Sequence, residues 1–360
     1  MAISPDVLAT ALQELMPKYS ETFTQWHPVL DRVVLKGNIS RATLKGPYRE
    51  FTVVTDGPGS VTQIVGGSEV IAGGRRQNAV RGNTYAPRLI YSFDVPGKDL
   101  AEANGEMDLA RILQNYPEEG LNDFYERIAD QTMNGNGSQV GGFPTFNGDT
   151  TFNPDGTART GFFEFAAPAA QTDTVHGLAK QGAGAGVSGW YNQYGLCTSF
   201  ATNGRRRMRE VYFAAGRQGR SMGPVDLILA DEASYLNYLD DLDEHVRVSE
   251  VKNDHVPGKI RQGIKFLDAD MFLEDALDPS GATWNGGAGR NGVMYFLKTS
   301  SWYAYTLGHD SGKETKGDFA SRGPFRLPEQ DLWRYEIVLY MDIHTNQMRC
   351  NGVLEGTSIP

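Results

Sequence analysis

The sequence predicts a mixed α+β protein whose strands are joined by many turns and long connections. Several segments alternate apolar and polar residues with the period of a β-strand, most regularly at 333–343. A buried strand at 225–230 runs into a helix opened by Asp231, which is a strand-helix unit. The 42 glycines in 360 residues exceed the roughly 7% usual in globular proteins, which indicates many turns.

Composition excludes several classes of protein. The net charge of -10 argues against tight wrapping of a phosphate backbone, although such a protein could still enclose DNA. The two cysteines, Cys197 and Cys350, are too far apart in sequence to indicate a disulfide framework or a zinc cluster. No apolar run approaches the roughly 20 residues that span a bilayer, and the N-terminus lacks the basic region of a secretory signal. We expect synthesis in a reducing cytoplasm and no membrane contact.

The N-terminal region predicts one short helix followed by an arm. Ser4, Pro5 and Asp6 form a helix start, and the following apolar residues share one face up to about Met16. Residues 17–35 show no period, so we expect an extended arm there.

A long hairpin comes next. Residues 48–56 and 85–95 alternate in the manner of strands, with about 28 glycine-rich residues between them. A connection of that length inside a domain is usually functional. We therefore predict a projecting hairpin over 36–98.

A long acidic helix is predicted over 117–133, with 107–115 as either a separate helix or its kinked first half. Residues 138–200 should form irregular strands and loops. Regular structure returns with a helix at 203–215, and the helix after Asp231 should turn Leu236, Leu239, Leu242 and Val246 inward. Further strands are expected at 263–267, 292–297, 301–306 and 333–343.

Two glycine motifs suggest chemistry that their surroundings do not support. Residues 184–189 match the dinucleotide fingerprint, but no strand precedes them and no amphipathic helix follows. Residues 219–223 match the nucleophile elbow around Ser221, yet the helix precedes the serine and the strand follows it. The six histidines are isolated, and the acidic run at 240–244 lacks calcium-loop spacing. We therefore expect no catalytic residue, no metal site and no cofactor.

Charge divides sharply between neighbouring segments. Residues 36–93 carry eight basic and three acidic side chains, whereas residues 99–133 carry nine acidic and two basic ones. A basic hairpin that lies on the acidic helix of the next copy would explain this pattern. The expected contact residues are Arg75, Arg76, Arg81 and Arg88 on the hairpin, and Glu118, Glu119, Asp123, Glu126 and Asp130 on the helix. Two alternatives stay open: the hairpin folds onto its own helix, or the asymmetry arises by chance.

A second basic group lies at the start of the 203–215 helix. It comprises Arg205, Arg206, Arg207 and Arg209. These side chains suit either a phosphate group or neighbouring carboxylates, and the sequence leaves both open.

The order of elements resembles the major capsid proteins of tailed bacteriophages, which have the HK97-type fold. The resemblance covers essentially the whole chain and is strongest at 225–236, 292–297 and 302–305. It implies an N-terminal arm at 1–35, a hairpin called the E-loop at 36–98, and a peripheral domain with a spine helix at 99–155. It further implies an axial domain over most of 156–324, and return strands of the peripheral domain with the C-terminus at 325–360.

The same resemblance implies a structural, non-enzymatic subunit of hexamers and pentamers in an icosahedral shell around double-stranded DNA. Portal, scaffolding and decoration proteins are the implied partners, the virion capsid is the implied location, and assembly would occur in the bacterial cytoplasm. The absence of lysine between Lys45 and Lys98 makes a hairpin lysine cross-link unexpected. Two alternatives stay open: an encapsulin compartment of the same fold, and a β-rich hydrolase or glycan-binding protein.

Overall fold

The computed structural model describes the chain in segments. The described residues are 5–12, 14, 28–35, 37–41, 49–55, 79–84, 88–102, 112, 120, 122–124, 126–133, 174–180, 186–219, 222–243, 250–252, 262–277, 292–306, 319–327 and 330–357. They build two larger sheets, two short hairpins and the helices that cover them.

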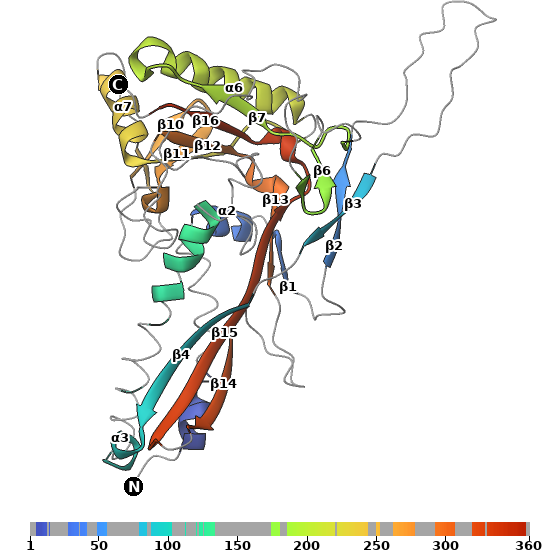
Figure 1. Ribbon diagram of the computed structural model, residues 1–360. Coiled ribbons are helices and arrows are strands. Elements are labelled where there is room, and N and C mark those ends of the chain that lie inside the picture. Colours follow the sequence, from blue (N-terminus) through green and yellow to red (C-terminus); the bar gives the residue numbers. More distant parts are fainter. Residues whose placement is uncertain are drawn as a thin grey trace, which may run out of the picture.

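A seven-stranded mixed sheet forms one end of the molecule (Figure 1). Its central strands are buried along their whole length, and alternate residues enter two different cores. Leu227 and Leu229 enter one core, and Ile228 and Ala230 enter the other. Because both faces are covered, these strands read in the sequence as continuous apolar runs. In sheet order, the strands are β7 (Gln193–Leu196), β16 (Gly352–Glu355), β12 (Val293–Leu297), β8 (Leu227–Ala230), β11 (Ala269–Leu273), β10 (Gln262–Phe266) and β9 (Glu250–Lys252).

Helices α6 (Arg205–Gln218) and α7 (Glu232–Asp243) pack against this sheet (Figure 1). The helices predicted at 203–215 and after Asp231 are thus confirmed. The predicted inner face of α7 is wrong at Leu236, which is 48% exposed, because Tyr235 and Tyr238 fill the inward positions. The short helical turns of this region are the π-helix η2 (Phe200–Gly204) and the 3-10 helices η4 (Asp275–Leu277), η5 (Thr299–Ser301) and η6 (Met348–Cys350).

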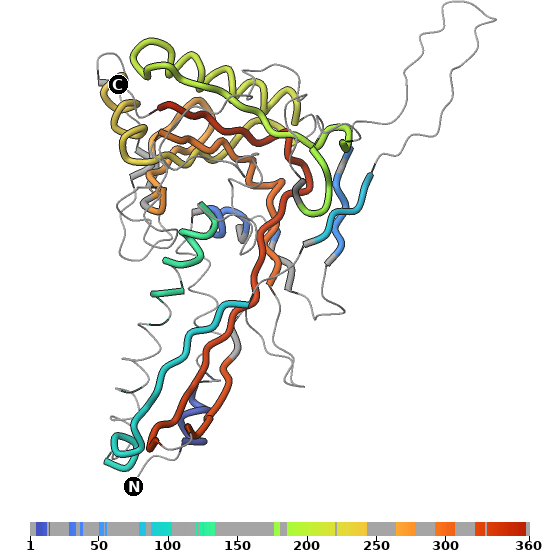
Figure 2. Tube along the Cα trace, in the orientation of Figure 1, coloured from blue at the N-terminus to red at the C-terminus, as the bar shows by residue number. Residues whose placement is uncertain are grey.

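The longest strand, β15 (Leu332–Thr345), connects the two ends of the molecule (Figure 2). Its first part lies between β4 (Arg88–Pro96) and β14 (Phe319–Arg326), and the three form a long narrow arm. Its last part pairs with β13 (Trp302–Thr306), which pairs in turn with β1 (Ile39–Arg41). At the tip, helix α3 (Gly97–Glu102) begins where Gly97 N donates to Asp331 O at 2.8 Å.

The predicted alternation along β15 is confirmed. One face of the strand is at most 1% exposed at Tyr335, Ile337, Leu339, Met341 and Ile343. Leu8 and Leu12 of the predicted N-terminal helix join the same core, and the hydroxyl of Tyr335 donates to Pro5 O at 3.1 Å. The N-terminal helix is therefore fixed to the arm of its own chain.

Two predictions near the chain ends are wrong. Residues 28–35, expected in an extended arm, form helix α2 (Pro28–Leu35). Proline suits the first turn of a helix, and Val29, Leu30 and Val33 then share one buried face. Residues 352–355, expected among the return strands of the arm, instead form β16 between β12 and β7 in the seven-stranded sheet.

Two glycines near α6 give a matched test of this packing. Gly216→Ala should raise the free energy of unfolding by about 0.5–1 kcal/mol, because alanine suits a helix better. The added Cβ would meet Pro224 Cα at an ordinary 3.6 Å. Gly204→Ala should lower the same free energy by about 1–3 kcal/mol, since its Cβ would lie 2.5 Å from the ring of Phe200. Urea unfolding measures both, and changes of the same sign would contradict the described packing.

Candidate subunit interface

A two-stranded hairpin projects from the junction of the two sheets (Figure 1). Strand β2 (Arg49–Val54) pairs with β3 (Ala79–Thr84), so the prediction that residues 48–56 pair with 85–95 is wrong. Phe51 lies opposite Gly82, whose missing side chain leaves room for the ring: a Cβ there would lie 2.8 Å from Phe51 Cζ. Residues 88–96 pair instead with β15, which offers a partner of matching length.

The base of the hairpin is held by aromatic contacts. The ring of Phe51 lies 4.3 Å from that of His344 on β15 and 5.3 Å from that of His176, measured between centroids. Tyr303 of β13 also stacks on His344, with 5.6 Å between the ring centroids. Asn83 N donates to His176 O at 3.0 Å. The hairpin is therefore attached to the body by this ring cluster, by that backbone hydrogen bond, and by apolar side chains of both strands that pack against the core.

His176 occupies a tight turn between β5 (Thr174–Val175) and β6 (Leu178–Ala179). Both turn residues have positive φ, 51° at His176 and 76° at Gly177, as two-residue hairpin turns require. Burial lowers the pKa of His176 from 6.5 to about 4. The imidazole is therefore neutral in the folded protein at neutral pH.

The hairpin root should consequently weaken in acid. Between pH 6.5 and 4 the unfolded chain binds a proton at His176 that the folded chain does not. The free energy of unfolding therefore decreases as the pH is lowered through this range, by at most about 3 kcal/mol from this group. His176→Asn keeps a residue that tolerates positive φ and removes the titration. The variant should show a smaller loss between pH 7 and 4.5 in urea unfolding. Parallel pH profiles for the two proteins would contradict this.

The arginines predicted for the hairpin differ in their surroundings. Arg81 lies on β3 and pairs with Glu50 at 2.7 Å, yet 79% of its side chain is exposed. Arg88 belongs to β4, where it lies 3.7 Å from Glu336 of β15, so its assignment to the hairpin is wrong. Arg75 and Arg76 lie outside the described residues.

The acidic helix lies against the arm. Residues 126–133 are helical, as predicted, and Phe124 meets the ring of Tyr91 on β4 at 6.4 Å. Asp123 and Glu126 are exposed, whereas Asp130 is only 7% exposed within its own chain, which contradicts its place on a contact surface. Glu118 and Glu119 lie outside the described residues.

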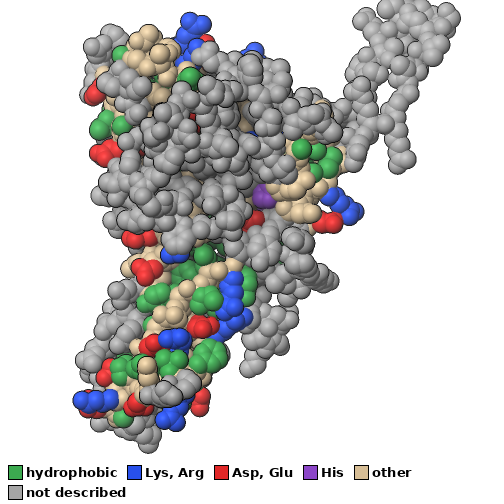
Figure 3. All heavy atoms as spheres, in the orientation of Figure 1, with side chains coloured by type: hydrophobic (Ala, Val, Ile, Leu, Met, Phe, Trp, Pro, Cys, Tyr) green, Lys and Arg blue, Asp and Glu red, His purple; other side chains and the backbone are tan. Residues whose placement is uncertain are grey.

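The outer face of the arm carries a surface that sequence reasoning missed. Ile90 on β4 and Phe325 on β14 are 45% and 47% exposed, among interspersed charged side chains (Figure 3). Arg334 binds Asp94 through two hydrogen bonds of 2.8 and 2.9 Å, and these hold the pKa of Asp94 below its usual value. The signal for this surface was Ile90 itself, an apolar residue on the otherwise polar side of an alternating strand.

The second arginine group is mostly paired within the chain. Arg205 binds Asp241 at 2.9 Å, and Arg206 and Arg207 bind Glu210 at 2.9 and 2.8 Å. Of the two interpretations left open, the structure favours pairing with nearby carboxylates for these three. Arg209 is exposed.

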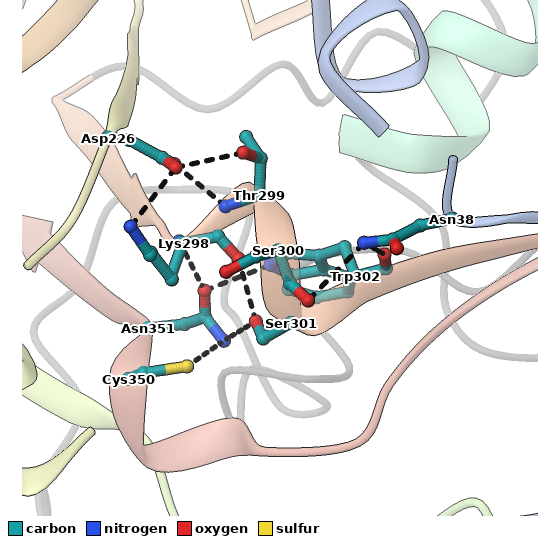
Figure 4. A network of polar contacts seen from close by, with 9 residues as sticks. All are labelled: Asn38, Asp226, Lys298, Thr299, Ser300, Ser301, Trp302, Cys350 and Asn351. Carbon is teal, nitrogen blue, oxygen red and sulfur yellow. Dashed lines mark hydrogen bonds and ion pairs between the residues drawn. The ribbon is translucent and has the colours of Figure 1, made fainter. Parts of the chain in front are cut away.

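A buried polar joint connects the seven-stranded sheet to the arm (Figure 4). Asn351, 1% exposed, lies at its centre. Its Oδ1 accepts from Lys298 N at 2.8 Å and from Trp302 Nε1 at 2.9 Å. Its Nδ2 donates to Ser301 Oγ at 3.1 Å and to Gln347 O at 3.2 Å. One amide thus binds both strands where the chain turns from β12 into β13.

A carboxylate secures the same turn from the sheet side. Asp226 accepts from Thr299 N at 2.8 Å and Thr299 Oγ1 at 3.0 Å, and lies 3.3 Å from Lys298 Nζ (Figure 4). Asn38 binds the far side through a 3.1 Å hydrogen bond from Nδ2 to Trp302 O. The joint therefore fixes the direction in which the arm leaves the sheet.

Around 219–223 the order is helix then strand, as predicted, with Gly219 N donating to Ala215 O at 2.7 Å, and Ser221 lies outside the description. In the described segments, no cluster of three metal-ligating side chains occurs. None of the described helices combines the length and apolar character needed to cross a bilayer.

No protein-family model matches this chain, and no curated protein matches it. Solved structures do. The encapsulin complex of SrpI from Synechococcus elongatus PCC 7942 has a TM-score of 0.50 at 9% identity, covering 92% of this chain and 89% of that one. The capsid of a native GTA particle has a TM-score of 0.50 at 10% identity, and that of an empty GTA particle 0.51 at 10%, each covering 90% of both chains. The chain has the HK97-type fold of these shell proteins.

Proposed function

We propose that this chain is the major capsid protein of a tailed bacteriophage, a structural subunit that assembles into an icosahedral shell of hexamers and pentamers around double-stranded DNA. One observation carries the proposal: the shared fold extends over 90% of both chains when the GTA capsid is compared. A chain that shares its fold with a capsid protein over nine-tenths of its length is best explained as a shell subunit. The role is structural, and we propose no enzymatic activity.

Within that shell, the β2–β3 hairpin is the proposed clasp, the family's E-loop, which binds a neighbouring copy. Among the described strands it pairs only with itself. One face of the hairpin packs against the core of its own chain, whereas the other face is exposed at residues 50, 52, 81 and 83 and can bind a neighbour. Exposed Arg81 on the hairpin, and Asp123 and Glu126 on the acidic helix, supply opposite charges for that contact.

The domain roles follow the same proposal, with one change. The seven-stranded sheet with α6 and α7 is the proposed axial domain and includes β16. The arm with the acidic helix is the proposed peripheral domain. Portal, scaffolding and decoration proteins are the proposed partners, the bacterial cytoplasm is the proposed site of assembly, and the virion capsid is the final location.

An encapsulin compartment is the second candidate, since one of the similar structures is an encapsulin complex. Particles isolated from the producing bacterium separate the two. A capsid protein should sediment in megadalton particles with nuclease-protected double-stranded DNA of uniform length. DNA-free shells that hold a cargo enzyme would support the encapsulin. A monomer whose enzymatic turnover is lost in Ser221→Ala would contradict both.

A further inference from the structure

Helices α6 and α7 carry opposite net charge. The α6 sequence holds five arginines and one glutamate, net +4, and α7 holds four acidic residues and no basic one, net -4. Part of this charge is neutralised inside the chain, through Arg205–Asp241 and through the pairs that Arg206 and Arg207 make with Glu210. The charged side chains that remain, among those that the structure describes, are exposed.

That remainder has the same spacing on both helices. On α6, Arg209, Phe213 and Arg217 are exposed at positions i, i+4 and i+8, which are neighbours along one helix face. We call these three residues the basic stripe. Phe213 is 53% exposed between the two arginines.

On α7 the pattern recurs with the charge reversed. Glu232, Leu236 and Asp240 are exposed at the same spacing, and they form the acidic stripe. Leu236 is 48% exposed between the two carboxylates. Within the described part of the chain, none of the four charged members of the two stripes forms an ion pair with another side chain.

The fold of the isolated chain gives these stripes no role. Phe213 and Leu236 belong to neither core, and a single exposed apolar side chain needs no explanation. Here, however, one exposed apolar side chain lies between two positive charges and the other lies between two negative charges at the same spacing. The two surfaces are therefore complementary. Figure 3 shows basic side chains at the upper edge of this end of the molecule and acidic ones at its left margin.

We propose that the basic stripe of one copy packs on the acidic stripe of the next copy, with Phe213 against Leu236 and each arginine facing a carboxylate. The inference rests on the proposed function as a shell subunit. Because the two surfaces differ, the contact is head-to-tail and leads from copy to copy around a closed ring. Exposed ion pairs contribute about 1 kcal/mol or less each, so the stripes mainly set register and the choice of partner.

A charge swap tests the pairing. Arg209→Glu with Arg217→Glu, and separately Glu232→Arg with Asp240→Arg, should each lower the yield of assembled particles at least about tenfold while the monomer folds, since like charges then face each other. All four changes in one chain should restore assembly. Arg209→Lys with Arg217→Lys is the matched control, which keeps the charge and should assemble normally. Sedimentation gives the particle yield and circular dichroism confirms folding.

A cross-link locates the contact directly. Phe213→Cys with Leu236→Cys should give a ladder of disulfide-linked multimers on a non-reducing gel of assembled protein, and no ladder from dissociated protein. The native Cys197 and Cys350 are buried and should contribute little background.

The outcomes separate this inference from the proposed function. Unaltered assembly of the Arg209→Glu, Arg217→Glu variant, or failure of the four-fold swap to restore it, would overturn the stripe pairing and leave the shell function standing. Normal shells with reduced DNA content would instead assign the basic stripe to packaged DNA and likewise overturn the inference. A wild-type chain that forms no particles would remove the proposed function itself.

Discussion

Replacing Asn351 with leucine should lower the free energy of unfolding by about 3–5 kcal/mol, because buried groups left without a hydrogen-bond partner cost about 1–3 kcal/mol each. Leucine has the same branched skeleton with larger terminal groups, so the loss does not come from a cavity. The change removes the acceptor of Lys298 N and Trp302 Nε1 and the donor to Gln347 O, at a site 1% exposed. Urea unfolding of the isolated subunit measures the loss.

A double-mutant cycle identifies the cause. Trp302→Phe removes the indole N–H that Asn351 binds, so the double variant should cost about 1 kcal/mol less than the sum of the single variants. Strictly additive costs would show that the amide and the indole do not interact. Asn351→Leu should also alter particle size or uniformity wherever shells still form, since the joint sets the direction of the arm.

Reversing Arg75, Arg76 and Arg81 to glutamate together should abolish shell assembly while the monomer still folds. The change turns a basic hairpin acidic and sets it against the acidic helix of a neighbour, where like charges cost several kcal/mol. Within the chain only the exposed Arg81–Glu50 pair is lost among the described contacts, which contributes about 1 kcal/mol or less. Sedimentation measures assembly, and thermal unfolding of the monomer checks the fold.

The triple change to lysine is the control for this prediction. It keeps every positive charge, so shells should form in nearly normal yield. Adding Asp123→Arg and Glu126→Arg to the variant with the reversed hairpin should restore part of the assembly if the hairpin binds those two carboxylates of the neighbouring copy. Shells of normal yield from the reversed variant alone would contradict the clasp.

Long regular patterns made most of the fold predictable from sequence. The alternation along β15 identifies its buried face because five successive alternate positions are apolar. The continuous run at 227–230 and the Asp231 helix start locate β8 and α7 for the same kind of reason. Local sequence patterns are therefore enough to identify these elements.

Elements that depend on distant partners were missed. Strand β3 contains Gly82 and Asn83, which disfavour strands, and it forms because Phe51 covers the glycine. Strand β16 has four residues and no pattern, and only its pairing with β12 and β7 makes it a strand. Asp130 is acidic and helical, yet its burial depends on what packs over it.

The candidate interface was predictable in charge but not in position. The opposite charges of the hairpin and the acidic helix are visible in composition. The stripes on α6 and α7 are not, because the sequence places Leu236 on the inner face and does not show which arginines pair within the chain. Both the side on which Leu236 lies and the pairing of the arginines depend on the tertiary structure.

Negative-stain electron microscopy of the purified 360-residue protein decides whether the chain is a shell subunit. We expect closed, uniform, polyhedral particles built of many copies, or ring-shaped capsomers that convert to such particles. A field that contains only monomers or irregular aggregates, from protein that is folded by circular dichroism, would contradict this expectation.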